Sequence, residues 1–103
     1  MRITQRNGYS EVVPKRYLDK NKPITSLSPD LETQYRWKEG RPTSEIESYK
    51  AWFSQEGLPP FTVKFLDPID LPKYKALVEF EGLEGCEVKG NVYFRATRVK
   101  QIK

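Results

Sequence analysis

The chain has 103 residues, 37% of them hydrophobic and 13% aromatic, which is the size of one domain with a modest core. Disordered chains contain few aromatic residues, so this composition indicates a folded protein. Histidine is absent and Cys86 is the single cysteine, which excludes an intramolecular disulfide, a cysteine-rich zinc site and acid–base catalysis by histidine.

Other catalytic patterns are weak. Cys86 precedes Glu87, and acidic surroundings disfavour the thiolate that a nucleophile requires. The acids at positions 45 and 47, and at 79 and 81, are more typical of exposed strand faces than of a metal or glycosidic site. No glycine-rich phosphate loop is present, because the segment 82–85 is acidic and short. We therefore expect a protein that is not an enzyme and holds no cofactor or metal.

Charge and hydropathy indicate the compartment and the kind of partner. No apolar run approaches the roughly 20 residues of a membrane span, and no signal peptide opens the chain, so we expect a cytoplasmic protein with no membrane partner. The net charge is +4. Residues 91–103 carry four cations and no acid, and residues 1–29 carry six cations against two acids. Two basic ends around an acidic centre indicate a focused positive patch.

The first half of the chain changes from an irregular to an alternating pattern. Three prolines interrupt residues 1–30, which we expect to form an irregular N-terminal arm with room for one short strand. From Leu31 apolar and polar residues alternate to Lys38, as in a half-buried strand, and Gly40 suits a hairpin turn. Residues 44–53 then form a second strand by their aromatic content, or a helix that groups Ile46, Tyr49 and Phe53; the preceding hairpin turn favours the strand.

The second half continues with strands. Residues 61–65 alternate cleanly, residues 67–74 are a proline-bracketed connection, and residues 76–80 are a strand broken by Gly82 and Gly85. A turn at 89–91 precedes a final strand, residues 92–100, in which Phe94 faces inward and Tyr93 and Arg95 face outward. We expect a mainly β fold: a small five-stranded OB-like barrel over residues 31–103, ahead of an SH3-like barrel.

The predicted core leaves several aromatic rings unused. That core consists of Phe61, Val63, Phe65, Val78, Phe80, Val92 and Phe94. Cations lie beside the remaining rings, and unpaired bases stack on rings while cations neutralise phosphates. The predicted nucleic-acid site is therefore Tyr35, Arg36, Trp37, Lys38, Arg41, Tyr49, Lys50, Lys64, Tyr93 and Arg95. In the alternative interpretations these rings, with Trp52, pack the far side of the barrel or contact a protein partner.

Several segments resemble a known group of proteins. They are a basic hairpin that runs through Thr43 into Tyr49 and Lys50, the strand 61–65, the connection 72–74, and the strand 91–96 with its basic tail. Over about two-thirds of the chain this pattern is similar to small OB-fold single-stranded-DNA-binding proteins of phages and conjugative elements, of the gene V or conjugative accessory type. The resemblance implies sequence-tolerant coating of single-stranded DNA, or RNA, during replication or transfer. It also implies work beside a replication or transfer helicase, and homodimers or cooperative arrays; an adaptor of such an element is the alternative.

Overall fold

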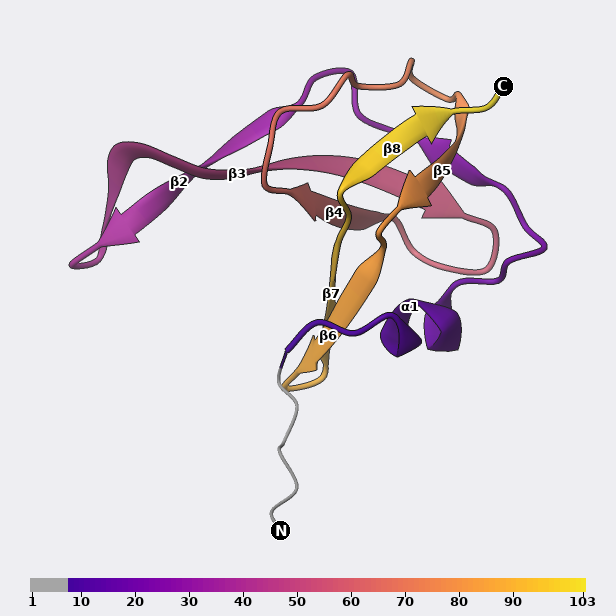
Figure 1. Ribbon diagram of the computed structural model, residues 1–103, viewed down its shortest axis with the longest axis horizontal. Helices are drawn as coiled ribbons and strands as arrows, with labels where there is room; N and C mark the ends of the chain where they lie inside the picture. Colours follow the sequence, from indigo (N-terminus) through magenta and orange to yellow (C-terminus); the bar gives the residue numbers. More distant parts are fainter. Residues whose placement is uncertain (1–7) are drawn as a thin grey trace, which may run out of the picture.

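The computed structural model describes residues 8–103, which form eight strands and one helix (Figure 1). Their bounds are α1 Val12–Tyr17, β1 Ile24–Ser26, β2 Glu32–Lys38, β3 Arg41–Gln55, β4 Phe61–Phe65, β5 Leu77–Glu81, β6 Glu84–Val88, β7 Asn91–Arg95 and β8 Arg98–Gln101. The mainly β class expected from the sequence is confirmed.

The strands join in one open sheet in the order β6-β7-β4-β3-β1-β5-β8, and β2 pairs with the first half of β3. All pairs are antiparallel except β4 with β7. The expected count of five strands is therefore wrong. The described residues form eight strands in one open sheet, not a closed five-stranded barrel.

Two of the extra strands come from breaks in the second half. Gly82, with φ +66°, turns the chain between β5 and β6, whereas Gly85, which we expected to be a second break, lies inside β6. The predicted single strand 92–100 is two strands. The amide of Ala96 donates to the carbonyl of Lys64 on β4, and the amide of Thr97 donates to Glu81 on β5. The backbone thus passes from one neighbour to another at residues 96–97, and β7 ends there.

The expected irregular arm instead contains a helix and a central strand, β1. Val13 of α1 is buried against Gly85, and β1 lies between β3 and β5. The buried side chain of Gln55 accepts a hydrogen bond from the amide of Asp19 and donates to the carbonyls of Asp19 and Lys22. Residues 8–30 are therefore part of the fold, and residues 1–7 of the expected arm lie outside the described residues.

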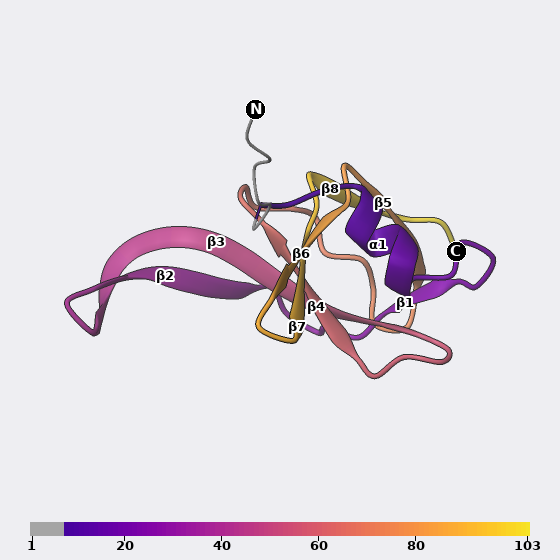
Figure 2. The same ribbon diagram turned by 90° about the horizontal axis from the view of Figure 1, so that it is seen from below.

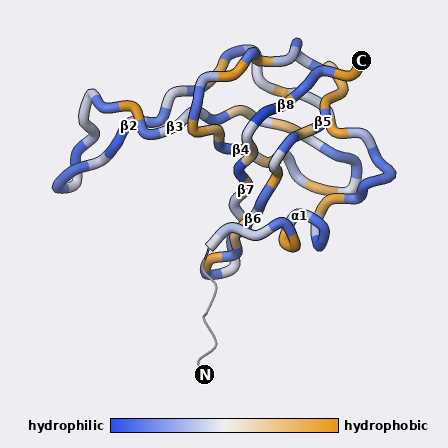
Figure 3. Tube along the Cα trace, viewed as in Figure 1, coloured by the Kyte–Doolittle hydropathy of each residue, from blue (hydrophilic) through white to orange (hydrophobic). Residues whose placement is uncertain are grey.

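The core follows the alternating pattern of the strands. Hydrophilic and hydrophobic residues alternate along the body in Figure 3. Of the predicted core, four residues are buried and three are half-buried against it; the buried four are Val63, Phe65, Val78 and Phe94. Phe53, which the sequence analysis did not assign to the core, is fully buried, and its ring meets that of Phe80 edge-on at 4.9 Å.

The β2–β3 hairpin extends away from this core, as two perpendicular views show (Figures 1 and 2). Its turn has Glu39 at φ 51° and Gly40 at φ 77°, two positive values that match the right-handed twist of a tight hairpin. The strand interpretation of residues 44–53 is confirmed, because all of them belong to β3, which is 15 residues long. Only the second half of β3 pairs with the body of the sheet, through β4 and β1.

Candidate nucleic-acid interface

A row of charged residues crosses five adjacent strands. Lys50 of β3 is directly opposite Lys64 of β4, which is beside Arg95 of β7. The row ends in a carboxylate on each side, Glu32 opposite Lys50 on β2 and Glu84 opposite Arg95 on β6. Directly paired residues project from the same face of a sheet, and neighbouring strands are about 4.8 Å apart. One face of the sheet therefore carries three consecutive cations between two acids, which we call the cation row.

The two carboxylates pair with the cations at the ends. Lys50 Nζ lies 3.8 Å from a carboxylate oxygen of Glu32, and Arg95 Nε lies 2.9 Å from one of Glu84. Lys64, in the middle, has no carboxylate within ion-pair distance among the residues that the structure describes. These are exposed or half-exposed pairs, which contribute roughly 0–1 kcal/mol, so an incoming anion can displace them.

Two aromatic side chains lie beside the cation row on the same face. Trp52 follows Lys50 by two residues and Tyr93 precedes Arg95 by two, so strand alternation puts each ring on the side of its cation. Both side chains are exposed, Trp52 by 39% and Tyr93 by 49%. The Trp52 indole donates to Glu32 at 3.0 Å, so this carboxylate orients the ring as well as pairing with Lys50. In this arrangement the rings can stack on bases while the cations neutralise phosphates.

Tyr9 covers one end of the cation row. Its ring centroid lies 4.1 Å from the guanidinium carbon of Arg95 and 5.7 Å from Lys64 Nζ, so both cations contact the aromatic ring. Two backbone hydrogen bonds of 2.9 Å between Ser10 and Gly85 hold this segment on β6. Burial is the main cause that raises the pKa of Tyr9, and the nearby Arg95 partly opposes it. The phenol is therefore neutral at neutral pH.

The residues of the predicted site fall into two groups. Lys50, Lys64, Tyr93 and Arg95 lie together on the face of the cation row. The other group lies on the β2–β3 hairpin and consists of Tyr35, Arg36, Trp37, Lys38 and Arg41. Tyr49 belongs to neither group, because it is half-buried, faces away from Lys50 by alternation and pairs with Phe65.

The hairpin separates its cations from its rings. Arg36 and Lys38 alternate with Tyr35 and Trp37 along β2, which directs the cations and the rings to opposite sides of this strand. The pairing with β3 shifts register on both sides of Tyr35. Arg36 pairs with Glu45 at 3.8 Å. Trp37 is 66% exposed, and alternation directs its sequence neighbours Arg36 and Lys38 to the opposite side of the strand. Neighbours in a strand belong to opposite surfaces, and for this reason the sequence pattern grouped side chains that the fold keeps apart.

The predicted site left out three side chains of the face that carries the cation row: Tyr9, Trp52 and Thr62, the last directly opposite Trp52. Trp52 was counted among the unused rings but was not assigned to the site. Spacing by two along the strands from Lys50 and Lys64 would have indicated Trp52 and Thr62. Tyr9 had no such signal, since it lies in the segment that we expected to be an arm.

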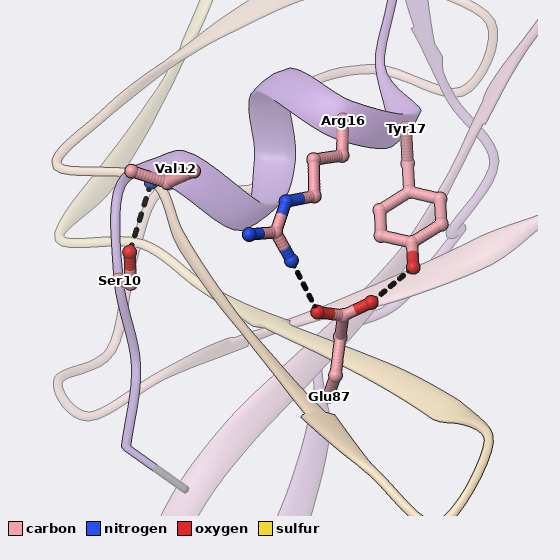
Figure 4. A network of polar contacts seen from close by, with 5 residues as sticks. All are labelled: Ser10, Val12, Arg16, Tyr17 and Glu87. Carbon is pink, nitrogen blue, oxygen red and sulfur yellow. Dashed lines mark hydrogen bonds and ion pairs between the residues drawn. The ribbon is translucent and has the colours of Figure 1, made fainter. Parts of the chain in front are cut away.

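A second polar cluster fixes the helix to the sheet (Figure 4). Glu87 of β6 accepts hydrogen bonds from Arg16, at 2.6 Å, and from the Tyr17 hydroxyl, one on each carboxylate oxygen. The hydrogen bond to Glu87 is the main cause that raises the pKa of Tyr17. Ser10 Oγ accepts from the amide of Val12, the first residue of the helix, at 3.0 Å. Glu87 is paired with Val92, so this cluster holds α1 on the face of β6 and β7 opposite to the one that carries Tyr93 and Arg95.

Residues 8–103 contain no group of three or more histidine, cysteine, aspartate or glutamate side chains suited to a metal ion. In the same range, no helix combines the length and the apolar character that crossing a membrane requires.

Comparison of the chain with protein-family models, with curated proteins and with solved structures gives no match.

Proposed function

We propose that this protein binds single-stranded nucleic acid, with single-stranded DNA as its main ligand, and that it is a cytoplasmic, non-catalytic strand-binding protein. The observation that carries the proposal is the cation row on β3, β4 and β7 with Trp52 and Tyr93 beside it. Phosphates of a strand would contact the cations, while bases stack on the exposed rings. Base stacking is tolerant of sequence, because every base has an aromatic face.

A single strand suits this surface better than a duplex. Sequence-specific duplex readers commonly insert a recognition helix into the major groove. The one helix of the described residues, α1, has six residues, and Val13 and Pro14 in its middle are buried. Exposed rings stack directly on unpaired bases, whereas on a duplex each ring would first have to unstack a base step, which costs a few kcal/mol.

The strand order supports a finer proposal for the fold, an open and elaborated OB-type topology. The series β1-β3-β4-β7 is bordered by β5 on one side and by β6 on the other. Only residues 82–83 separate β5 from β6, so one bent segment lies against both ends of the series. A parallel contact, β4 with β7, joins two strands that are distant in the chain.

The biological setting that we propose rests on the resemblance of the hairpin and strand motifs to strand-binding proteins of mobile elements. The protein would act for a phage, plasmid or conjugative element in DNA replication or conjugation, beside a helicase or as a homodimer on the strand.

Titration of tryptophan fluorescence with a dT 12-mer at several salt concentrations tests the proposed function. We expect quenching that weakens with salt, with a slope of log K against log salt near −2, about −0.7 for each of three phosphate contacts. Trp52→Phe should remove most of the quenching, whereas Trp37→Phe should retain it, because only Trp52 lies beside the cation row.

Point variants locate the interface. Lys64→Ala should flatten the salt slope by about 0.7, and Tyr93→Ala should weaken binding by about 1–3 kcal/mol for a lost stack. Lys100→Ala is the matched control, an exposed lysine on β8 paired with Glu79, and it should leave binding unchanged.

Phe94, next to Tyr93, is buried, so its substitution should affect stability. Phe94→Ala should lower the free energy of unfolding by about 3–5 kcal/mol. Absence of quenching by any single strand at low salt would contradict the proposal.

A second candidate function is a protein–protein adaptor, favoured by the rings of the hairpin. Tyr35, Trp37 and Ile46 are each at least 45% exposed, and exposed tryptophan and tyrosine are common in the hot spots of protein interfaces. A partner that binds through this face would respond to Trp37→Ala and not to Lys64→Ala.

A further inference from the structure

A pocket opens in the sheet beside the cation row. The β4–β7 ladder consists of only two residue pairs, Val63 with Phe94 and Lys64 with Arg95. On the side of Thr62 the ladder ends, and there a pocket of about 410 Å³ is present. Phe61, Val92 and Phe94 line it from the core. Its other walls are the rings of Tyr17 and Trp52, the loop residues 58–60, and Thr62.

The chemistry of the walls restricts what this pocket can hold. None of its lining side chains carries a charge, so it does not suit a phosphate. Two aromatic side chains, each 39% exposed, offer flat surfaces, and Thr62 offers a hydroxyl. Pro59 and Pro60 have no amide hydrogen, so their backbone contributes only acceptors. A planar, neutral group with apolar faces and polar edges fits these walls.

The pocket is continuous with the cation row. Trp52 and Thr62 line the pocket and are directly paired on the outer face. Lys50 and Lys64 follow on the same strands, two residues away and on the same face. A group that enters the pocket is therefore attached to something that passes over cations at its mouth, as a base is attached to a phosphate backbone.

We infer that this pocket takes one unpaired base of the bound strand, out of the stack of its neighbours, while the flanking phosphates contact Lys50 and Lys64. The inference rests on the proposed function and adds a base-binding site to it. An apolar side chain of a protein partner would fill the same walls, but it would leave Lys50 and Lys64 at the mouth without a role.

Neutral nucleosides separate this site from the cation row, because they carry a base and no phosphate. Thymidine and adenosine, titrated into isotope-labelled protein, should shift the NMR signals of the Trp52 indole and of the Leu58 and Val92 methyl groups. These shifts should be insensitive to salt, whereas shifts caused by a dT 12-mer should weaken as salt rises. The Trp37 indole, on the hairpin, serves as the internal control.

A matched pair of substitutions tests the pocket in the full chain. Leu58→Phe fills the pocket, and Ile102→Phe makes a comparable change at an aliphatic residue that is 52% exposed, follows β8 and lies outside both the pocket and the cation row. Leu58→Phe should weaken binding of the dT 12-mer about 5- to 150-fold, the loss of one stacked base, with the salt slope unchanged. Ile102→Phe should change the affinity less than twofold, and circular dichroism melts check that both variants fold.

The outcomes distinguish the two proposals. If the 12-mer binds with the expected salt slope but nucleosides cause no shift at the pocket and Leu58→Phe binds normally, the pocket inference is wrong and the strand-binding function stands. If nucleosides shift the pocket signals but no strand binds, the strand-binding function is wrong and so is the claim that the base belongs to a bound strand. If N-acetyl-tryptophanamide shifts these signals and nucleosides do not, the pocket receives a protein side chain and the inference is overturned.

Discussion

Gly85 illustrates how a single residue decides the contact between the helix and the sheet. A Cβ atom at this position would lie 2.7 Å from Cγ1 of Val13 and 3.3 Å from the ring of Phe94. Glycine is thus required here for close approach of α1 to β6, and its backbone is extended within the strand. Gly82 has the other role of glycine, a left-handed turn with φ +66°. From the sequence both appear as strand breaks, because the helix that distinguishes them was not expected.

Gly85→Ala should therefore destabilise the protein by about 1–3 kcal/mol, because Val13 is β-branched and stiff and α1 must move away from β6. Gly8→Ala is the control, since a Cβ there meets nothing within 4 Å and the change should stay within about 0.5 kcal/mol. Urea unfolding followed by circular dichroism measures both. Equal stability of the two variants would show that α1 does not pack on β6 as described.

At the scale of the elements, five of the eight strands were predictable from alternation, and the pairing partners were not. Alternation correctly predicted strands in residues 31–38 and 61–65 and the inward phase of Phe94, whereas the predicted strand 92–100 is divided into β7 and β8. The break between β7 and β8 depends on which neighbouring strand accepts the backbone hydrogen bonds of residues 96 and 97. The helix α1 has only six residues, so it needs its contacts with β6 to be stable. The cation row has the same origin, because Lys50, Lys64 and Arg95 meet only through the register of three strands.

The β2–β3 hairpin is an element that the body does not need for folding. Burial along β3 begins at Ser48, and the residues before it are exposed or half-exposed. Replacing residues 35–47 by Asn-Gly would join Gln34 to Ser48, which are already paired, through a turn suited to a hairpin. The free energy of unfolding should change by less than about 1 kcal/mol, because mainly exposed side chains are removed.

The same hairpin deletion tests which group of residues binds the strand. It retains the cation row, Trp52 and Tyr93, so affinity for the dT 12-mer should fall less than tenfold in the fluorescence titration. Complete loss of binding in a protein that melts cooperatively would transfer the interface to the hairpin cations and rings.

At the scale of the whole molecule, the N-terminal part of the described chain holds the two sides of the sheet together. β1 pairs with β3 on one side and with β5 on the other, and β8 pairs only with β5. The amide of Ser26 donates to Ala76, and Ser26 accepts from Lys75. Val78 and Val99, carried by β5 and β8, complete the core around Phe53. Without β1 these two strands lose their hydrogen-bonded connection to β3.

We expect the fragment 31–103, the segment that the sequence alone suggested as a complete barrel, to be unfolded. Loss of β1 would leave one edge of β3, from Phe53 to Gln55, and one edge of β5 unpaired beside an exposed core. A domain of this size is only marginally stable, so it would not tolerate this loss. The fragment 24–103 keeps β1 but lacks α1 and the contacts of Gln55 with residues 19 and 22, so it should melt cooperatively at a lower temperature than the full chain. Thermal melts by circular dichroism and the dispersion of amide NMR signals compare the three proteins. A fragment 31–103 that melts cooperatively at the temperature of the full chain would mean that β1 is an accessory strand, and the core would then have to be assembled from β3, β4 and β7 alone.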